Sequence, residues 1–433
     1  MEIAAQTANA TAAGPFGSNL VSRDYVESGV PVIRGQNLQS RWVGGEFVFV
    51  TPEKAEALRT NTAKPGDVVF TQRGTLGQVA LVPGGVFDRY VISQSQMKLT
   101  VDPAKADSAF VYYACISADF TRQVFDNAVA AGVPHINLGI LRSLRIPIPS
   151  LDVQRGIAAV LGTIDDRIDL FRQTNDTLEA IAHALFKSWF VDFDPVRAKA
   201  EGREPEGMDA ETAALFPSEF DESELGLIPK GWRAGLLSDF SVLNASKWTS
   251  KNHPQSIRYI DLSGVSQNRI DQSTLYIFGE APSRARHHLR DGDTIIGTVR
   301  PGNRAFAYIH EPEATLTGST GFAVLSPKYK HLSSFVYLAA TREEAIARLE
   351  NLADGGAYPA VRPSVVAETP CIIPCPNTLR RFSELANPLM ARVCEGGAHA
   401  RALADLRDTL LPRLISGKLR MPDVSEFVEE EKA

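Results

Sequence analysis

One short pattern occurs twice in this sequence. KPGDVVFTQRGTLG fills residues 64–77, and RDGDTIIGTVRPGN fills residues 290–303. Both copies have Gly-Asp, then three apolar or β-branched residues, and then a short turn rich in Arg, Gly and Thr. A chain of 433 residues is too long for one compact core. Two copies in such a chain therefore predict a fold made of two similar halves.

Other segments match when the sequence is aligned with itself at one fixed offset, which places position 110 on position 335. We call this offset the repeat shift. They are FVYYA at 110–114 with FVYLA at 335–339, SQSQMKLTV at 93–101 with GSTGFAVLS at 318–326, and RIPIP at 145–149 near CIIPCP at 371–376. The second match is a polar turn followed by a strand in both copies. The two Gly-Asp patterns align one position further along, which a small loop insertion explains.

Each copy ends in a long helical segment with an apolar stripe. The first stripe is Ile157, Ile164, Phe171, Leu178 and Leu185, and the second is Phe382, Leu389, Leu403 and Leu410, with Gly396 in the middle position. A further column in each helix comprises Leu161, Ile168, Ala182 and Trp189 in the first and Ala386, Val393, Ala400 and Leu414 in the second. The seven-residue spacing is typical of a coiled-coil seam.

Two interpretations of the stripes remain open. Each helix could pack on its own domain, or the two helices could bury their stripes on each other, which we favour because the stripes match. Pro388 and the pair Gly396-Gly397 predict a kink or break in the second helix.

The predicted fold class is α+β, with two β-rich domains, each followed by a long helix, in an internal repeat. The family resemblance described below implies that the two helices are antiparallel and separate the domains in a pseudo-twofold arrangement. The segments are a first block at 1–150, a helix at 151–190, an acidic connector at 191–225, a second block at 226–376, a helix at 377–420 and a disordered tail at 421–433. Within the blocks, residues 106–128 and 331–352 are expected to be helical. The connector is expected to be exposed, with short helical pieces.

The distribution of charge permits the blocks to bind an anion. The net charge of the chain is −6, but residues 151–225 alone carry −10, while 1–150 carry +1 and 226–376 carry +3. No apolar run is long enough for a membrane span, and the start of the chain is unlike a secretory signal. The four cysteines are too few for a disulfide scaffold, and Cys371 and Cys375 are interpreted as core residues, which fits a reduced, cytoplasmic compartment.

Motifs of catalysis are absent from the sequence. It has no GxxxxGK[ST] phosphate loop, no GxGxxG and no HExxH. His287-His288 is interpreted as part of a solvated basic loop, and Asp165-Asp166 as the solvated face of a helix. These features favour a binding scaffold over an enzyme. A metal-dependent nuclease without a recognisable motif stays as an alternative.

With these features together, the chain resembles the specificity subunit of type I restriction–modification systems over nearly its whole length. The phrases that carry the resemblance are GPFGSNL (14–20), GVPVIRGQNL (29–38), GDVVFTQRGTLGQVALVP (66–83), INLGILRSLRIPIPSLDVQ (136–154), LFKSWFVDFDPVRAK (185–199), IPKGW (228–232) and LLPRLISGKLR (410–420). IPKGW opens the second block, but residues 1–13 contain nothing similar. The first block is therefore expected to lack an edge strand.

The resemblance implies that each block is a target-recognition domain that reads one half of a split sequence in double-stranded DNA. It also implies two methyltransferase subunits, which carry S-adenosylmethionine, and restriction subunits, which use ATP and Mg²⁺. The chain itself would hold no cofactor, no metal and no catalytic centre. The competing interpretation is a coiled-coil scaffold that binds only proteins and no DNA.

The candidates for DNA contact are polar and cationic residues in turn-rich loops. They are Arg34, Gln36, Asn37, Arg73, Thr75, Gln78, Lys247, Lys251, Arg286, His287, Thr298, Arg300 and Asn303. Arg pairs with guanine, and Asn or Gln with adenine, in the major groove, whereas contacts to phosphate fix only position. The alternative is that these loops only turn the chain and keep it soluble.

Overall fold

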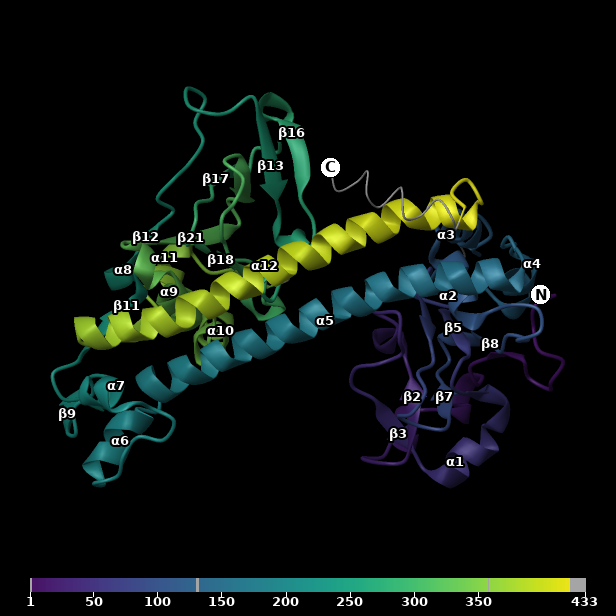
Figure 1. Cartoon of the computed structure of the whole chain (residues 1–433), viewed down its shortest axis with the longest axis horizontal. Coiled ribbons are helices and arrows are strands. Elements are labelled where there is room, and N and C mark those ends of the chain that lie inside the picture. The colour runs from purple at the N-terminus through teal and green to yellow at the C-terminus, as the bar shows by residue number, and fades with distance from the viewer. Residues whose placement is uncertain (1, 130–131, 357, 421–433) are drawn as a thin grey trace. The chain divides into compact units, whose positions relative to one another are not determined.

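Two 40-residue helices organise the computed structural model, which describes residues 2–129, 132–356 and 358–420. They are α5 (Leu151–Phe190) and α12 (Pro376–Ile415). The chain divides into two units, Met1–Asp169 with Arg401–Ala433 and Leu170–Ala400, so the division falls inside both helices. Each unit contains one β-rich block and one part of each helix (Figure 1). The α+β class and the two blocks are confirmed; the predicted tail at 421–433 lies outside the described residues.

The repeat shift is confirmed by the helices. In the first block these are α2 (Ser108–Ile116), α3 (Ala118–Asp126) and α4 (Leu138–Ser143), and their counterparts are α9 (Ser333–Thr341), α10 (Glu343–Asn351) and α11 (Pro363–Ala367). The first residues of these three pairs, and those of α5 and α12, all obey the same shift. The helices expected at 106–128 and 331–352 are each split in two, because Ser117 and Arg342 adopt an extended ψ near 150°.

Each block contains two four-stranded sheets with the same strand order. In block 1 the first sheet has the strand order β1 (Thr11–Ala13), β8 (Gln96–Leu99), β5 (Val68–Thr71) and β6 (Val79–Leu81). The second sheet has the order β3 (Val48–Val50), β2 (Val30–Ile33), β7 (Tyr90–Ile92) and β4 (Thr62–Ala63). In block 2 the first sheet has the strand order β12 (Ser241–Leu243), β21 (Phe322–Pro327), β18 (Thr294–Gly297) and β19 (Phe306–Tyr308). The second sheet has the order β16 (Thr274–Ile277), β13 (Ser256–Ile260), β20 (Leu316–Ser319) and β17 (Ala285–His288). The pairs β2–β7 and β13–β20 are parallel and the other pairs are antiparallel.

Smaller elements differ between the blocks. Block 1 has α1 (Pro52–Ala57), and block 2 has α8 (Leu237–Phe240) with the strand pairs β14 (Val265–Ser266) and β15 (Arg269–Ile270), and β11 (Arg233–Leu236) and β22 (Pro370–Ile373). Residues 145–148, which match β22 in the repeat, form no strand, and Ile148 is 43% exposed. Among the described residues of block 1 there is thus no counterpart of β11, as the missing opening motif predicts. The other edge strand, β1, is present.

The repeated Gly-Asp pattern builds a turn that enters a buried strand. The carboxylate of Asp67 accepts a hydrogen bond from the backbone N–H of Lys64 at 3.0 Å, and that of Asp293 accepts one from Arg290 at 2.8 Å. The preceding glycines have φ values of +86° and +85°, a conformation that favours glycine. The pattern recurs because both turns need the same backbone and the same carboxylate acceptor.

The two buried aspartates have different partners. Asp67 forms an ion pair with Lys98 on β8 at 3.0 Å. In block 2 the registers of β5–β8 and β18–β21 put Val324 in the place of Lys98. Burial therefore dominates at Asp293 and raises the pKa of its carboxyl to about 6, although the hydrogen bond from Arg290 opposes this shift.

Helices α5 and α12 pack antiparallel on each other in both units, where they lie side by side (Figure 1). In unit 2 the rings of Phe186 and Phe382 are 5.9 Å apart, and those of Phe171 and His399 are 5.3 Å apart. In unit 1, Arg407 of α12 donates to Asp165 of α5 at 2.8 Å. Asp165 is 5% exposed and also accepts from the Tyr113 hydroxyl at 2.7 Å. Its interpretation as a solvated residue was therefore wrong.

The apolar stripe of the helices is wider than a two-helix seam. Ile157, Phe382 and Leu410 are buried, whereas Ile164, Phe171, Leu178, Leu185, Leu389 and Leu403 are half-buried. The second column, Leu161, Ile168, Ala182, Trp189, Ala386, Val393, Ala400 and Leu414, is fully buried. The helices pack on each other and also on the block of the unit, since Phe382 contacts Phe335 of α9. Both interpretations of the stripe therefore hold.

The break expected at Pro388 and Gly396 was wrong, because α12 is one continuous helix. Ala386 and Met390 on either side of the proline are fully buried, and this packing holds the helix together. Gly396 is buried against α5, and a Cβ at this position would overlap the side-chain amide of Asn175 unless that amide moved. The glycine thus serves the helix pair and does not end the helix.

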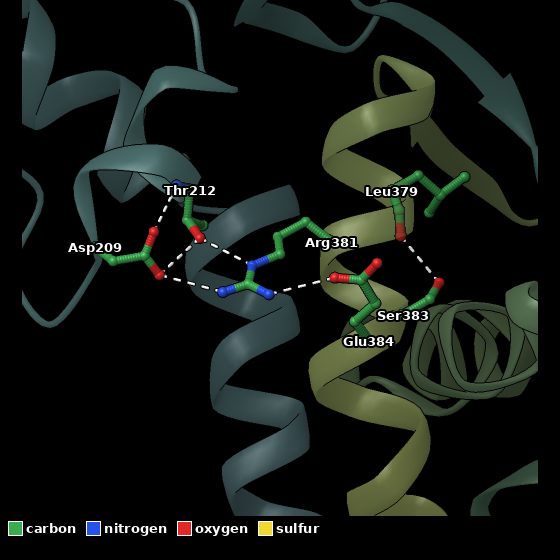
Figure 2. Close-up of polar contacts among 6 residues, drawn as sticks. All are labelled: Asp209, Thr212, Leu379, Arg381, Ser383 and Glu384. Carbon is green, nitrogen blue, oxygen red and sulfur yellow. Dashed lines mark hydrogen bonds and ion pairs between the residues drawn. The ribbon is translucent and has the colours of Figure 1, made fainter.

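The acidic connector is bound to unit 2. It contains α6 (Asp194–Ala200), α7 (Ala210–Ala214) and β9 (Phe220–Ser223), and β9 pairs with β10 (Gly226–Pro229) at the start of block 2. Phe193, Val196 and Phe216 are buried in the unit 2 core. Arg381 of α12 donates to Thr212 at 2.9 Å and to Asp209 at 3.2 Å (Figure 2). The short helical pieces are confirmed, but the prediction of a wholly exposed connector was wrong.

Two further expectations concern the cysteines and the membrane. Cys371 is buried in the unit 2 core, as expected, whereas Cys375 is half-buried and its sulfur lies 2.9 Å from the Thr378 hydroxyl. In the part of the chain that the structure describes, no helix has the length and hydropathy that crossing a membrane requires.

We expect Gly396→Ala to destabilise the helix pair in spite of the higher helix propensity of alanine. Overlap with Asn175 should cost about 1–2 kcal/mol more than the propensity gain. In an Asn175→Ala background the same change should be neutral or stabilising by up to about 1 kcal/mol. Urea unfolding midpoints of the four proteins test this double-mutant cycle. A higher midpoint for Gly396→Ala alone would contradict it.

Asp293→Asn should stabilise the chain above pH 6. The folded pKa of Asp293, about 6, lies above the ordinary value of 3.8, so the folded state binds more protons between these values. The unfolding free energy therefore falls as pH rises from about 4 to 6, and asparagine should remove that loss, worth about 2–3 kcal/mol at most. Unfolding measured from pH 4.5 to 7.5 tests the difference between the two proteins.

Asp67→Asn is the matched control for this prediction. It removes the partner of Lys98, whose side chain is 8% exposed, and should destabilise by about 3–5 kcal/mol at pH 7. Equal effects of the two substitutions would show that burial of the Asp293 carboxylate is not the cause.

Candidate nucleic-acid interface

Four loops of block 1 meet at one end of its two sheets, and we call residues 14–20, 72–78, 93–95 and 132–136 the block 1 loop end. Backbone bonds join them. Gln72 N–H donates to Ser95 O at 2.6 Å, and Ile136 N–H donates to Gln72 O at 3.0 Å. The Gln94 amide donates to the carbonyls of Gly17 and Leu20. These contacts fix the four loops as one surface.

Loop 14–20 is held closely and exposes an aromatic residue. A Cβ at Gly14 would overlap the Ser93 carbonyl, so only glycine permits this approach to turn 93–95. Phe16 nevertheless has 87% of its surface exposed.

Block 2 has an equivalent loop end, formed by residues 244–252, 298–304 and 319–321 and by the loop before α11, of which 354–356 and 358–361 are described. Thr298 N–H donates to Gly321 O, and Val361 N–H donates to Thr298 O, each at 2.9 Å. Arg300 N–H donates to Pro359 O at 2.7 Å, which matches the bridge between Arg73 and His135 in block 1. The repeat therefore extends from the sheets to the loops.

In block 1, most of the predicted contact residues are exposed or half-buried and therefore remain candidates. Arg73 and Thr75 are exposed at the tip of loop 72–78, and Gln78 is half-buried and accepts a bond from the Thr71 hydroxyl at 3.1 Å. Gln36 is exposed and Arg34 is half-buried beside this loop end.

Asn37 is not available to DNA. It is 1% exposed, and its carbonyl oxygen accepts from Arg34 N–H at 2.9 Å. Its amide donates to the carbonyls of Gly44 and Glu46 at 2.8 and 3.0 Å. Because all of these bonds are internal, its prediction as a DNA-binding residue was wrong.

In loop 298–304 of block 2, Arg300 and Asn303 are exposed, but Thr298 is not. Thr298 is 6% exposed and its hydroxyl donates to Gly321 O at 2.8 Å, which removes it from the candidates. Arg304 forms an ion pair with Glu343 at the base of the same loop. The donors that this loop presents are therefore Arg300 and Asn303.

The remaining candidates of block 2 surround strand β17. Lys247 and Lys251 are exposed, and the Arg286 guanidinium lies 5.3 Å from the Phe278 ring centre. His253 stacks on the same ring at 3.9 Å. Cationic groups interleaved with aromatic rings are typical of surfaces that contact a nucleic-acid backbone or a base.

His287 is a structural residue and not a cation. It points into the block from β17 and is 2% exposed. Burial, and secondarily the charge of Lys247, lower the pKa of its imidazole to about 4, so it is neutral near pH 7. The expectation of a solvated basic loop was wrong, because β17 alternates buried and half-buried side chains.

Sequence reasoning missed two of the four loops. The turns 93–95 and 319–321 had a usable signal, since SQSQ and GSTG occupy equivalent places in the repeat. Loop 132–136 and the loop before α11 share little sequence, and only the repeat shift relates Val133 to Tyr358. No group of three or more metal-ligating side chains occurs among the residues that the structure describes.

Comparison with known proteins agrees with this geometry. Residues 22–180 match the family model of the type I restriction modification DNA specificity domain. The chain is 26% identical to the HindI specificity subunit of Haemophilus influenzae over 405 residues, which cover 82% of this chain and 87% of that one. It is 23% identical to the MjaIX specificity subunit of Methanocaldococcus jannaschii, over 83% and 79% of the two chains.

A solved structure shares the fold. The S subunit of a type I restriction–modification system from M. genitalium matches with a TM-score of 0.54 at 15% identity, over 94% of this chain and 93% of that one. Residues 22–180 thus match the DNA specificity domain, and over most of its length the chain is similar to specificity subunits of type I restriction–modification systems.

Proposed function

We propose that the chain reads a bipartite sequence in double-stranded DNA, with each loop end recognising one half-site. In this proposal two methyltransferase subunits and the restriction subunits assemble on the chain in the cytoplasm. Those partners supply S-adenosylmethionine, ATP and Mg²⁺, and the chain supplies the choice of sequence.

The observation that carries the proposal is that the loop ends share a framework but not their side chains. Equivalent strands and backbone bonds support both ends. At equivalent places, however, block 1 has Gln94 and Val133, whereas block 2 has Thr320 and Tyr358. Two different sets of side chains on one framework are suited to two different half-sites.

Charge supports the same assignment. The blocks are slightly basic, and the acidic surplus lies in 151–225, which contains α5 and the connector. Attraction of DNA is therefore favoured at the blocks and opposed at the connector. A scaffold that binds only proteins has no need of two such loop ends.

The helices support a fixed gap between the half-sites. Each has 40 residues and is continuous, which corresponds to a length of about 60 Å. One turn of DNA is about 34–36 Å, so the length of each helix is sufficient for half-sites that lie one turn apart.

A methylation map tests the proposal. We would express the chain with its cognate methyltransferase subunit and sequence the host DNA for N6-methyladenine. The expected result is a split motif with a fixed gap that disappears when this chain is omitted. Methylation that is unchanged without the chain would refute the proposal.

We further expect Arg73→Ala and Arg300→Ala to act on opposite half-sites. Loss of a base-edge contact costs about 1–3 kcal/mol, so discrimination at one base pair should fall about 10- to 100-fold. Competition binding of the methyltransferase-bound complex to single-base variants of the motif measures this. Arg89→Ala is the control, because Arg89 pairs with Glu56 at the start of β7, away from turn 93–95. Equal losses at both half-sites would count against base reading.

A further inference from the structure

Arg300 and Tyr358 lie against each other at the block 2 loop end. The guanidinium carbon of Arg300 is 4.8 Å from the centre of the Tyr358 ring. The two residues come from different loops, Arg300 from loop 298–304 after β18 and Tyr358 from the loop before α11. Tyr358 is 72% exposed, so the ring contributes little to the core. Its contact with the arginine is therefore a feature of the surface.

The backbone of both residues is held in place. Arg300 has φ +49° and ψ 65°, a left-handed conformation that non-glycine residues adopt rarely and that is found most often at functional sites. Its N–H donates to Pro359 O at 2.7 Å, and its carbonyl accepts from Asn303 N–H at 2.9 Å. Tyr358 N–H donates to Gly355 O at 2.9 Å. The loops are thus fixed around the stacked pair.

Stacking prepares the guanidinium for planar recognition. An arginine on an aromatic face keeps its N–H groups directed outward in one plane, where two of them fit the O6 and N7 atoms of guanine. A freely moving arginine loses side-chain entropy when it binds, and a stacked one loses less. The ring therefore increases the discrimination that the arginine provides.

We propose that Tyr358 is a positioning residue for specificity, whose ring holds the Arg300 guanidinium in the plane in which it reads one guanine of the second half-site. This inference rests on the proposed function and adds the base that is read and the residue that sets the geometry. Val133 has the same place in the repeat and is 56% exposed, but it has no ring. Block 1 accordingly reads its half-site without such a stack.

The test uses the complex of the full chain with its methyltransferase subunit. Its relative affinity is measured for the mapped motif and for every single base-pair change in both half-sites. Tyr358→Ala should reduce discrimination about tenfold at one G·C pair of the second half-site, the same pair that Arg300→Ala affects. Tyr358→Phe should keep discrimination within about twofold, because the ring is retained.

Two controls separate positioning from general damage. Tyr329→Ala removes an exposed tyrosine that follows β21 in the same block, outside the loop end, and should leave the discrimination at every pair unchanged. The double substitution Arg300→Ala with Tyr358→Ala should be no worse than Arg300→Ala alone, because the ring acts through the arginine.

Three results would overturn the inference. They are unchanged discrimination in Tyr358→Ala, a loss spread over both half-sites, and a Tyr358→Phe protein that behaves like the alanine variant. If the unaltered complex showed no second half-site, the proposed function itself would fail. If it showed one that Arg300→Ala relaxes and Tyr358→Ala does not, only the role of Tyr358 would fail.

Discussion

The antiparallel packing of α5 on α12 is the contact on which the rest of the structure depends. In unit 2 the Phe186 and Phe382 rings pack together and also contact Phe335 of the block. In unit 1, Ile157 and Leu410 share a core with block 1. Each part of the helix pair therefore belongs to the core of one unit, and separated helices would leave both cores open to water. This explains why α12 continues through Pro388, which in the interior of an isolated helix costs about 3 kcal/mol.

The Gly-Asp turn belongs to the strand framework that both blocks share, and the loops whose side chains differ between the blocks follow the strands that it begins. Its carboxylate closes the turn before β5 and β18, and the loop with the exposed arginine follows each of these strands. The buried strands require apolar side chains, whereas the loop tips do not. Side chains at the tips can therefore differ between blocks without a change in the core, which a reader of two unlike half-sites requires.

Much of the fold was predictable, because repetition and periodicity survive in one sequence. The repeat shift located the paired helices, and the seven-residue spacing of apolar residues indicated which side of α5 and α12 faces the core. The errors concern tertiary contacts. Pro388 and Gly396 are tolerated because of packing that lies far away in sequence, and Asp165 is buried because Tyr113 and Arg407 satisfy its carboxylate. In the candidate interface, Asn37, Thr298 and His287 have the residue types of a DNA contact, but their burial follows from strand and loop geometry that composition does not encode.

One acidic side chain of α5, the buried Asp165 in unit 1 and the half-buried Glu179 in unit 2, ties each block to the helix pair. Asp165 accepts from Tyr113 of α2, and Glu179 accepts from Tyr337 of α9 and from Asn268 at 3.1 Å. Burial raises the pKa of Glu179 and, with the nearby carboxylate, that of Tyr337. Such bonds have strict geometry, and loss of one partner leaves a polar group buried without a bond. Apolar packing alone would permit a block to slide on the helices. These bonds define one orientation of each block on its part of α5, which the proposed reading of bases by the loop ends requires.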